Sequence, residues 1–401
     1  MAWHGPLANR NFRLFWFSLV LSNTGVWLQI VAQGWLMLEL TDSAGFLGLM
    51  GFCRAVPLLA LSPLAGVVVD RLELRRLLYV TQAIALLLAA LLGTLTVVGA
   101  VRPWHILVIT ALDAANLAFD QPGRHTLVPS LVGEERLVSA LSLNAAAFHG
   151  SAIGGPSLAG VLIHLIGISG CFLLNAASYL VFIVALAMLV VPPRRRQTAA
   201  RSMRGELGAG VRHIFRQPMV VPLLTCSAAL NTFGRAYQLL MPVFARDILR
   251  VGAQGLGFLM AAPGLGTVLA ATLLSGSVGG KRRGPMVVGS MALFGGLVIL
   301  FAGSRHLSFS LLALVGIGML YNTFGSVTNA LLQTSVSSEY RGRVLSFYTM
   351  SQMGLYQLGG LAIGLLADLI GAPVAVALGG ASILVVLGGL MPQARRLWKV
   401  P

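Results

Sequence analysis

Charged side chains are scarce in this 401-residue chain, and lysine is almost absent. Asp, Glu, Lys and Arg together make up 10% of the residues, well under the share of about a quarter found in soluble domains. The only lysines are Lys281 and Lys399, and no G-x-x-x-x-G-K-[ST] motif occurs. The sequence therefore argues against a P-loop nucleotide site.

Residues for metal or redox chemistry are also few. Cys53, Cys171 and Cys226 all fall inside apolar runs, where cysteine usually acts as a small packing residue. The seven histidines show no metal-ligand spacing. We expect no metal, no cofactor and no enzymatic activity.

Long apolar runs make up most of the chain. Hydrophobic residues account for 57% of the sequence, and runs of about 20 residues, enough to cross a bilayer core, recur throughout. The sequence predicts an all-α membrane protein with twelve transmembrane helices. Their approximate ranges are 13–38, 44–69, 76–99, 104–129, 136–165, 168–191, 218–245, 253–276, 284–304, 307–334, 342–369 and 373–391.

The net charge of +16 lies mainly in short loops between the apolar runs. Arginines gather on alternate loops, which is the positive-inside pattern of membrane proteins and not a stripe that would bind nucleic acid. We expect a multi-pass protein of the inner (plasma) membrane with both termini in the cytoplasm, in contact with lipid and not with nucleic acid.

Short segments recur roughly half the chain apart. Ser22-Asn23-Thr24-Gly25 is repeated in Leu230-Asn231-Thr232-Phe233-Gly234, and Leu165-Ile166-Gly167 in Leu369-Ile370-Gly371. Two parallel repeats of six spans form a known transporter architecture. We therefore expect two six-helix bundles, 1–191 and 218–401, related by pseudo-twofold symmetry and joined by a cytoplasmic linker at 192–217.

Four motifs resemble those of the major facilitator superfamily. Gly66-x-x-x-Asp70-Arg71 with Arg75-Arg76 resembles its loop motif between spans two and three, although Glu73 replaces a usual glycine. Phe119 to Pro129 and Arg341-Gly-Arg343-Val are similar to the branch that includes the enterobactin exporter and drug–proton antiporters. The antiporter motif of span five is resembled by Gly155, Pro156 and Gly160. The fourth-span arginine motif of many multidrug members is absent.

The resemblance implies a gate on the cytoplasmic side. Asp120 is expected to join the loop residues in a charge network that holds one transport state, although simple anchoring of the loop is the alternative. The predicted gating residues are Gly66, Asp70, Arg71, Arg75, Arg76, Asp120, Arg341 and Arg343.

Two charged residues lie deep in predicted spans. Arg54 and Asp113 each sit about ten residues into a span, and ionisable groups at that depth are costly unless paired or hydrated. They are predicted to form an ion pair. A fixed structural bridge and a role in proton coupling remain equally open.

Polar and aromatic side chains of the spans are candidates for lining a substrate cavity. Arg235 in span seven either extends toward the outer interface or binds an anionic substrate. Other polar groups, such as Gln352, are further candidates, and some will only bridge helices. The predicted substrate-binding residues are Asn23, Gln29, Gln33, Asn231, Arg235, Gln238, Tyr321, Asn322 and Tyr356.

Taken with the resemblance, the sequence indicates a secondary transporter that works by alternating access. We expect a monomer that exports a small organic molecule, such as a drug-like compound or siderophore, in exchange for protons. Uptake of a nutrient or metabolite by symport is one alternative. A non-transporting sensor or assembly factor built on a transporter fold is another.

Overall fold

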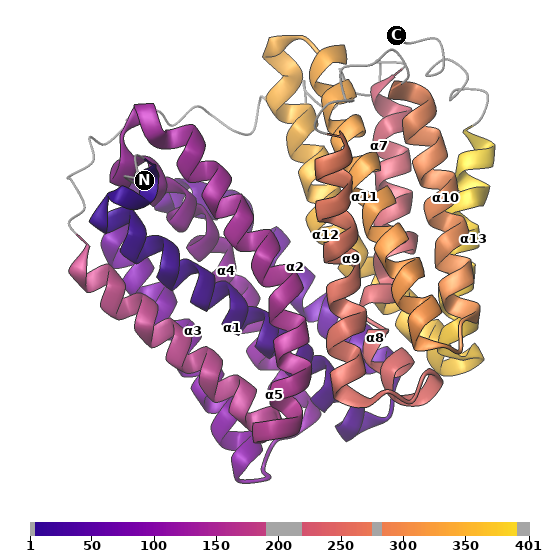
Figure 1. Ribbon diagram of the computed structural model, residues 1–401, viewed down its shortest axis with the longest axis horizontal. Helices are drawn as coiled ribbons and strands as arrows, with labels where there is room; N and C mark the ends of the chain where they lie inside the picture. Colours follow the sequence, from indigo (N-terminus) through magenta and orange to yellow (C-terminus); the bar gives the residue numbers. More distant parts are fainter. Residues whose placement is uncertain (1–4, 190–218, 275–282, 391–401) are drawn as a thin grey trace. The chain divides into compact units, whose positions relative to one another are not determined.

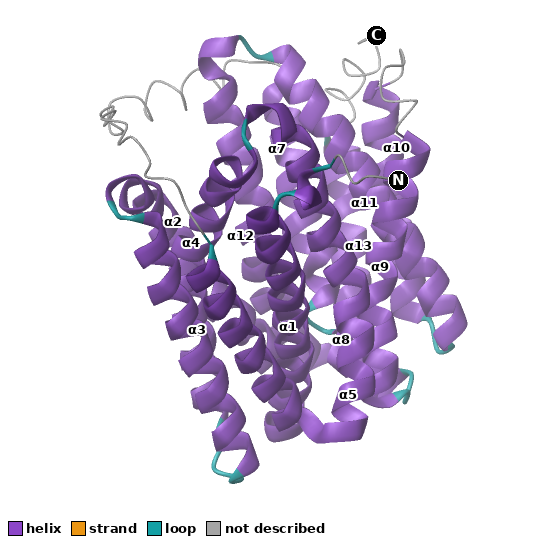
Figure 2. Cartoon of the chain, turned by 60° about the vertical axis from the view of Figure 1, so that its left-hand side comes forward, coloured by secondary structure: helices purple, strands orange, loops and turns teal. Residues whose placement is uncertain are grey.

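The computed structural model describes residues 5–189, 219–274 and 283–390, and Figure 1 shows their helices. The predicted linker at 192–217 lies outside these residues, so the division of the chain at that point stays a prediction. All regular elements in the described ranges are helices (Figure 2), as the sequence predicts.

Each helix begins and ends within a few residues of a predicted span. One long helix, α5, covers the fifth and sixth predicted spans, and shorter pieces cover the seventh. The main helices are α1 (Arg10–Thr41), α2 (Ala44–Arg71), α3 (Leu74–Val97), α4 (Pro103–Val132), α5 (Leu137–Met188), α9 (Gly252–Leu274), α10 (Arg283–Gly303), α11 (Leu307–Ser335), α12 (Ser338–Ile370) and α13 (Ala372–Gly389).

Two of these helices carry a local break or cap that the sequence explains. Within α5, Gly167 has a φ of 75° and a ψ of 173°, a conformation that only glycine adopts readily. The break divides α5 into two membrane-length halves. At the start of α1, the Asn9 side chain accepts hydrogen bonds from the backbone N–H groups of Asn11 and Phe12, which caps the helix.

Nine helices in the described part of the chain are long and apolar enough to cross a membrane. α5 is one of them and contains two spans. The two remaining predicted spans are α4, whose apolar run is interrupted by polar residues, and the irregular segment 220–248. The helices therefore account for all twelve predicted spans and confirm the all-α membrane fold.

The described residues divide into two compact units. The first contains residues 5–42, 56–189 and 252–261, and the second contains 43–55, 219–251, 262–274 and 283–390. α2 and α9 each contribute to both units, because the first part of each helix belongs to one unit and the rest to the other.

The first unit is built around α1, which packs along α5, while α3 packs on both α4 and α5. Phe12, Phe15 and Phe182 are almost completely buried in this core. The rings of Phe15 and Phe182 meet edge to face with centroids 6.0 Å apart, a favourable arrangement for aromatic pairs.

In the second unit, α10 packs between α11 and α13, and α12 packs on α13 and on segment 220–248. Glycine allows close backbone approach here. A Cβ atom at Gly318 of α11 would collide with the backbone oxygen of Pro263 in α9. Small residues at such contacts are typical of helices that pack in membranes.

The start of α2 is held by a carboxylate from the end of α12. Asp368 accepts hydrogen bonds from the Ser43 hydroxyl at 2.6 Å and from the backbone N–H groups of Ala44 at 2.7 Å and Gly45 at 3.0 Å. Negative charge at a helix N-terminus is stabilising. Beside this cap, a Cβ at Gly364 would lie 2.7 Å from the backbone oxygen of Ala44.

Candidate functional site

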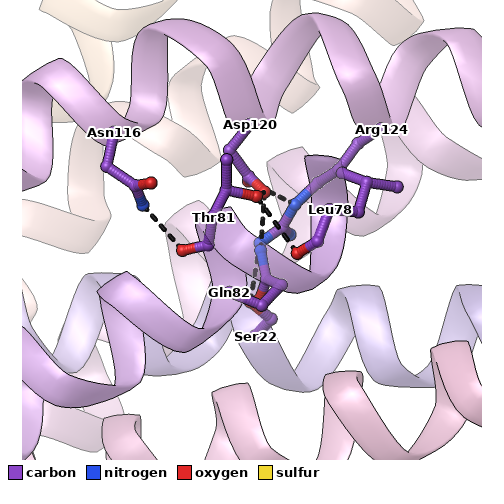
Figure 3. Close-up of polar contacts among 7 residues, drawn as sticks. All are labelled: Ser22, Leu78, Thr81, Gln82, Asn116, Asp120 and Arg124. Atoms are coloured by element: carbon purple, nitrogen blue, oxygen red, sulfur yellow. Dashed lines mark hydrogen bonds and ion pairs between the residues drawn. The ribbon is translucent and has the colours of Figure 1, made fainter. Parts of the chain in front are cut away.

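A buried polar network lies in the first unit, where α1, α3 and α4 meet (Figure 3). Asp120 of α4 forms an ion pair with Arg124 one helical turn later, with 2.6 Å between Oδ2 and Nε. The other carboxylate oxygen of Asp120 accepts hydrogen bonds from the Thr81 hydroxyl at 2.8 Å and the Gln82 amide at 2.6 Å, both on α3.

Arg124 is held on its other sides as well. Its Nη2 donates to the Ser22 hydroxyl of α1 at 3.2 Å, and its Cζ lies 4.5 Å from the centre of the Phe182 ring. The side chains of Arg124 and Asp120 are only 13% and 6% exposed. A buried cation and a buried anion therefore balance each other within one turn of helix, and breaking such a pair is costly.

A second polar cluster lies in the second unit, around Arg235. Its Nη1 donates to the Tyr321 hydroxyl at 3.0 Å and to the backbone oxygen of Gln352 at 3.3 Å, and its Nη2 donates to Gln238 Oε1 at 3.1 Å. The Tyr321 hydroxyl also lies 3.2 Å from the side-chain oxygens of both Asn231 and Gln352. We call Asn231, Arg235, Gln238, Tyr321, Gln352 and Tyr356 the Arg235 cluster.

Two tyrosine rings face the guanidinium. The Cζ atom of Arg235 lies 4.8 Å from the centre of the Tyr321 ring and 4.3 Å from that of Tyr356. Both distances are within the range of cation–π attraction. The rings come from α11 and α12, so the cluster joins three different spans around one positive charge.

Span seven is irregular where it carries this cluster. α7 (Val220–Ala229) is followed by a π-helical turn at Leu230–Gly234 and a 3₁₀ turn at Arg235–Gln238. The short helix α8 (Met241–Val243) and a second π-helical turn at Phe244–Ile248 complete the span. π-turns inside helices occur frequently at functional sites.

The charge of Arg235 is not balanced as that of Arg124 is. In the three described stretches of the chain, no carboxylate lies within ion-pair distance of Arg235, and its Nε finds no hydrogen-bond acceptor there. The half-buried residues of the Arg235 cluster include Arg235, Tyr321, Gln352 and Tyr356. This is a positive charge inside a membrane span with neutral partners only.

The structure thus brings five of the nine predicted substrate-binding residues together, namely Asn231, Arg235, Gln238, Tyr321 and Tyr356. Asn322 is half-buried on α11. The other three, Asn23, Gln29 and Gln33, lie on α1 in the first unit.

The α1 glutamines differ from each other. Gln29 is buried, and its side-chain oxygen accepts a hydrogen bond from Asn175 at 2.6 Å, so it bridges two helices of the first unit. Gln33 is equally buried, but its side-chain nitrogen has no acceptor among the described residues. Gln33 therefore has a buried donor that no described residue satisfies.

The predicted gating residues mostly lie near the ends of α2, α3 and α12. Arg71 and Gly66 are exposed, and Arg76 forms an exposed ion pair with Glu73 at 2.8 Å. Arg75 donates to the backbone oxygen of Ala187 at 2.8 Å. On α12, Arg341 is exposed, and Arg343 lies over the Tyr340 ring.

The partners predicted for two acids remain predictions. The side chain of Asp70 is outside the described part of the structure, so its link to Asp120 is untested. Arg54 and Asp113 are both half-buried and belong to different compact units. Their predicted ion pair stays a prediction as well.

The motif of span five lies at a close helix contact. A Cβ at Gly160 would lie 2.7 Å from the backbone oxygen of Ala253 at the start of α9, and one at Gly155 would lie 2.5 Å from Cβ of Trp27. Gly155, Pro156 and Gly160 are all buried. The small size of Gly155 and Gly160 allows α5 to approach both neighbours.

Sequence reasoning missed the partners of Asp120. Thr81, Gln82 and Asn116 are ordinary polar residues in apolar runs, and Asn116 supports the network by donating to the backbone oxygen of Thr81. From the sequence, Arg124 would be counted among the arginines of the cytoplasmic loops. Its four-residue spacing from Asp120 is nevertheless a signal for a pair on one helix face.

The whole chain has recognisable relatives. It matches the protein family described as "Transmembrane secretion effector" over residues 1–400. It is 26% identical to the staphyloferrin A transporter of Staphylococcus aureus, over 90% of each chain. It is 25% identical to the multidrug efflux pump Tap of Mycolicibacterium fortuitum, over 92% of this chain and 90% of that one.

The fold has solved counterparts. The crystal structure of the nucleoside transporter NupG aligns with a TM-score of 0.77 and 13% sequence identity, and covers 96% of this chain and 99% of that chain. At this identity the likeness concerns the fold alone.

Proposed function

Because the chain belongs to the transmembrane secretion effector family of the major facilitator superfamily, we propose that it is a secondary transporter that exports a small organic molecule by alternating access. Relatives along nearly the whole chain carry the names staphyloferrin A transporter and multidrug efflux pump Tap. Both names support a substrate of small organic character.

The observation that carries this proposal is the Arg235 cluster. Transporters of this architecture bind their substrates near the bilayer midplane, at helices whose backbone is interrupted. Span seven is interrupted at Leu230–Gly234 and presents Arg235 directly afterwards. We assign the cluster as part of the substrate site.

The driving force in this proposal is the entry of protons. Asp113 is the candidate proton carrier, with Arg54 as its partner in one state of the cycle. The loop residues around Asp70 and the arginines of α12 form the cytoplasmic gate. The protein acts as a monomer in the inner membrane, with both termini in the cytoplasm.

Purified protein in proteoliposomes tests this function. We expect dyes or catecholate siderophores to move when a proton gradient is imposed, and the movement to stop when a protonophore removes the gradient. Asp113→Asn should uncouple transport from the gradient. Glu135→Gln, which removes an exposed acid of the same unit, is the matched control and should behave as the parent.

The outcomes separate the parts of the proposal. Movement of a compound that does not depend on the gradient would contradict proton antiport but would still support a transporter. Coupled movement that survives Asp113→Asn would reduce Asp113 to a structural residue. Absence of movement for every compound, in protein that remains folded, would contradict export.

A further inference from the structure

The guanidinium of Arg235 is a charged group with an incomplete set of partners. We infer that the Arg235 cluster binds an organic anion, with a carboxylate or similar planar oxyanion next to an aromatic ring. This inference rests on the proposed function, since it names the class of molecule that the exporter carries.

The first argument is the count of hydrogen-bond donors. A guanidinium has five N–H groups and no acceptor. Arg235 uses two of them from Nη1 and one from Nη2. The Nε–H and the second Nη2–H remain, and Nε is buried without an acceptor among the described residues. A carboxylate accepts two such bonds at once.

The second argument is charge. An ionised group inside a membrane span is costly unless it is paired or hydrated. The described partners of Arg235 are a hydroxyl, a backbone oxygen, an amide oxygen and two rings, all of them neutral. A bound anion would complete the charge balance, whereas a cation would be repelled.

The third argument is the surface beside the guanidinium. Tyr321 and Tyr356 each lie close to the guanidinium, and neither residue is fully buried among the described residues. Aromatic rings favour offset or edge-to-face contact with other rings. A ligand that carries a ring beside its anionic group would use both the charge and this ring surface.

A purely structural role for Arg235 is the alternative. The same chain shows what a structural arginine looks like, because Arg124 is bonded to a carboxylate at 2.6 Å and is only 13% exposed. Arg235 lies in a membrane span, and no carboxylate of the described residues pairs with it. Its contacts hold the guanidinium in place and leave its charge for a ligand.

Three probes with the same ring test the inference: 2-naphthoate, 2-naphthamide and 2-naphthylmethylammonium. They differ in charge and share the ring system. Binding is measured by calorimetry on the full-length protein in detergent. We expect the parent to bind 2-naphthoate at least about 10-fold more tightly than the neutral amide, and the cation most weakly, as expected for a desolvated charge pair.

The variants separate charge from folding. Arg235→Gln should abolish the preference for the anion, whereas Arg235→Lys should retain part of it because the charge stays. Arg305→Gln removes an exposed arginine of the same unit and should leave all three affinities unchanged. Equal melting temperatures of the variants show that each one folds.

Several results would overturn the inference: no binding of 2-naphthoate, equal binding of the anion and the amide, or a preference that survives Arg235→Gln. Transport of cationic dyes that is unaffected by Arg235→Gln would refute the anion class and leave export intact. Binding of 2-naphthoate without transport of any compound would support the site and contradict the exporter.

Discussion

Arg124 and Arg235, which each lie in a polar cluster, have opposite surroundings. Arg124 is paired with Asp120, and the acid is bonded to two further donors on α3. Arg235 is bonded to neutral groups only and is flanked by two tyrosine rings. The charge of Arg124 is therefore balanced by a neighbouring carboxylate, and that of Arg235 is not balanced by any carboxylate of the described residues.

The repeated halves of the sequence sharpen this contrast. The offset that relates Asn23 to Asn231 also relates Trp27 to Arg235, so the first half has a neutral ring where the second has the cation. The part of the second half that corresponds to Asp120 and Arg124 lies in the stretch from 324 to 334, which contains no charged residue. The charged residues of each cluster thus belong to one half only.

The largest expected effect on stability comes from breaking the buried ion pair between Asp120 and Arg124. Asp120→Asn leaves Arg124 buried without its counter-charge, and we expect the free energy of unfolding to fall by about 3–5 kcal/mol. Thermal unfolding in detergent measures this. The double variant Asp120→Asn with Arg124→Met removes both charges and should recover at least half of the loss. A double variant that is no more stable than Asp120→Asn would contradict this account of the pair.

A smaller effect is expected from one hydroxyl of the Arg235 cluster. Tyr321→Phe removes the acceptor of an Arg235 hydrogen bond and retains the ring. We expect the affinity for 2-naphthoate to fall about 5-fold, which corresponds to about 1 kcal/mol for one hydrogen bond. Tyr356→Phe is the matched control, since its ring faces Arg235 while its hydroxyl accepts from Gln357. Calorimetry that gives both variants the same loss would argue against a specific role of the Tyr321 hydroxyl.

The Arg235 cluster should contribute little to stability in the absence of a ligand. Arg235→Gln removes hydrogen bonds and cation–π contacts but also an unbalanced charge in the membrane. These effects offset each other, so we expect the free energy of unfolding to stay within about 1 kcal/mol of the parent. The same unfolding assay applies. A loss as large as that of Asp120→Asn would make Arg235 a structural residue.

The smallest effect should come from the exposed ion pair between Glu73 and Arg76. Its side chains are 60% and 83% exposed, so water and salt screen their attraction. Glu73→Gln should change the free energy of unfolding by less than about 0.5 kcal/mol. This variant provides the baseline for an ion pair without burial. A change that persists at high salt would point to a further contact of Glu73.

The spans were predictable because apolar runs of membrane length leave few alternatives. The composition of the Arg235 cluster was partly predictable too, since Asn231, Arg235 and Gln238 stand out as polar groups in an apolar run. Their mutual contacts were not predictable, because they depend on the π and 3₁₀ turns of span seven. The sequence of Leu230–Gly234 contains no strong local signal that predicts its π-helical turn.

The network of Asp120 shows a second limit. Thr81 and Gln82 reach Asp120 from another helix, and the rotation of α3 against α4 decides which polar residues meet. Helical periodicity places residues on a face of their own helix but leaves that rotation open. Arg124 was the one partner of Asp120 that could be predicted from the sequence, because of its four-residue spacing on α4.

The cap on α2 has a consequence for the order of events during synthesis. Ser43 and the Asp368 carboxylate that receives its hydrogen bond are 325 residues apart. A ribosome therefore finishes α2 long before it reaches the acid that caps it. Until α12 has been made, the backbone N–H groups of Ala44 and Gly45 lack the carboxylate that caps them, so one of the earliest helices to be made is among the last to be completed.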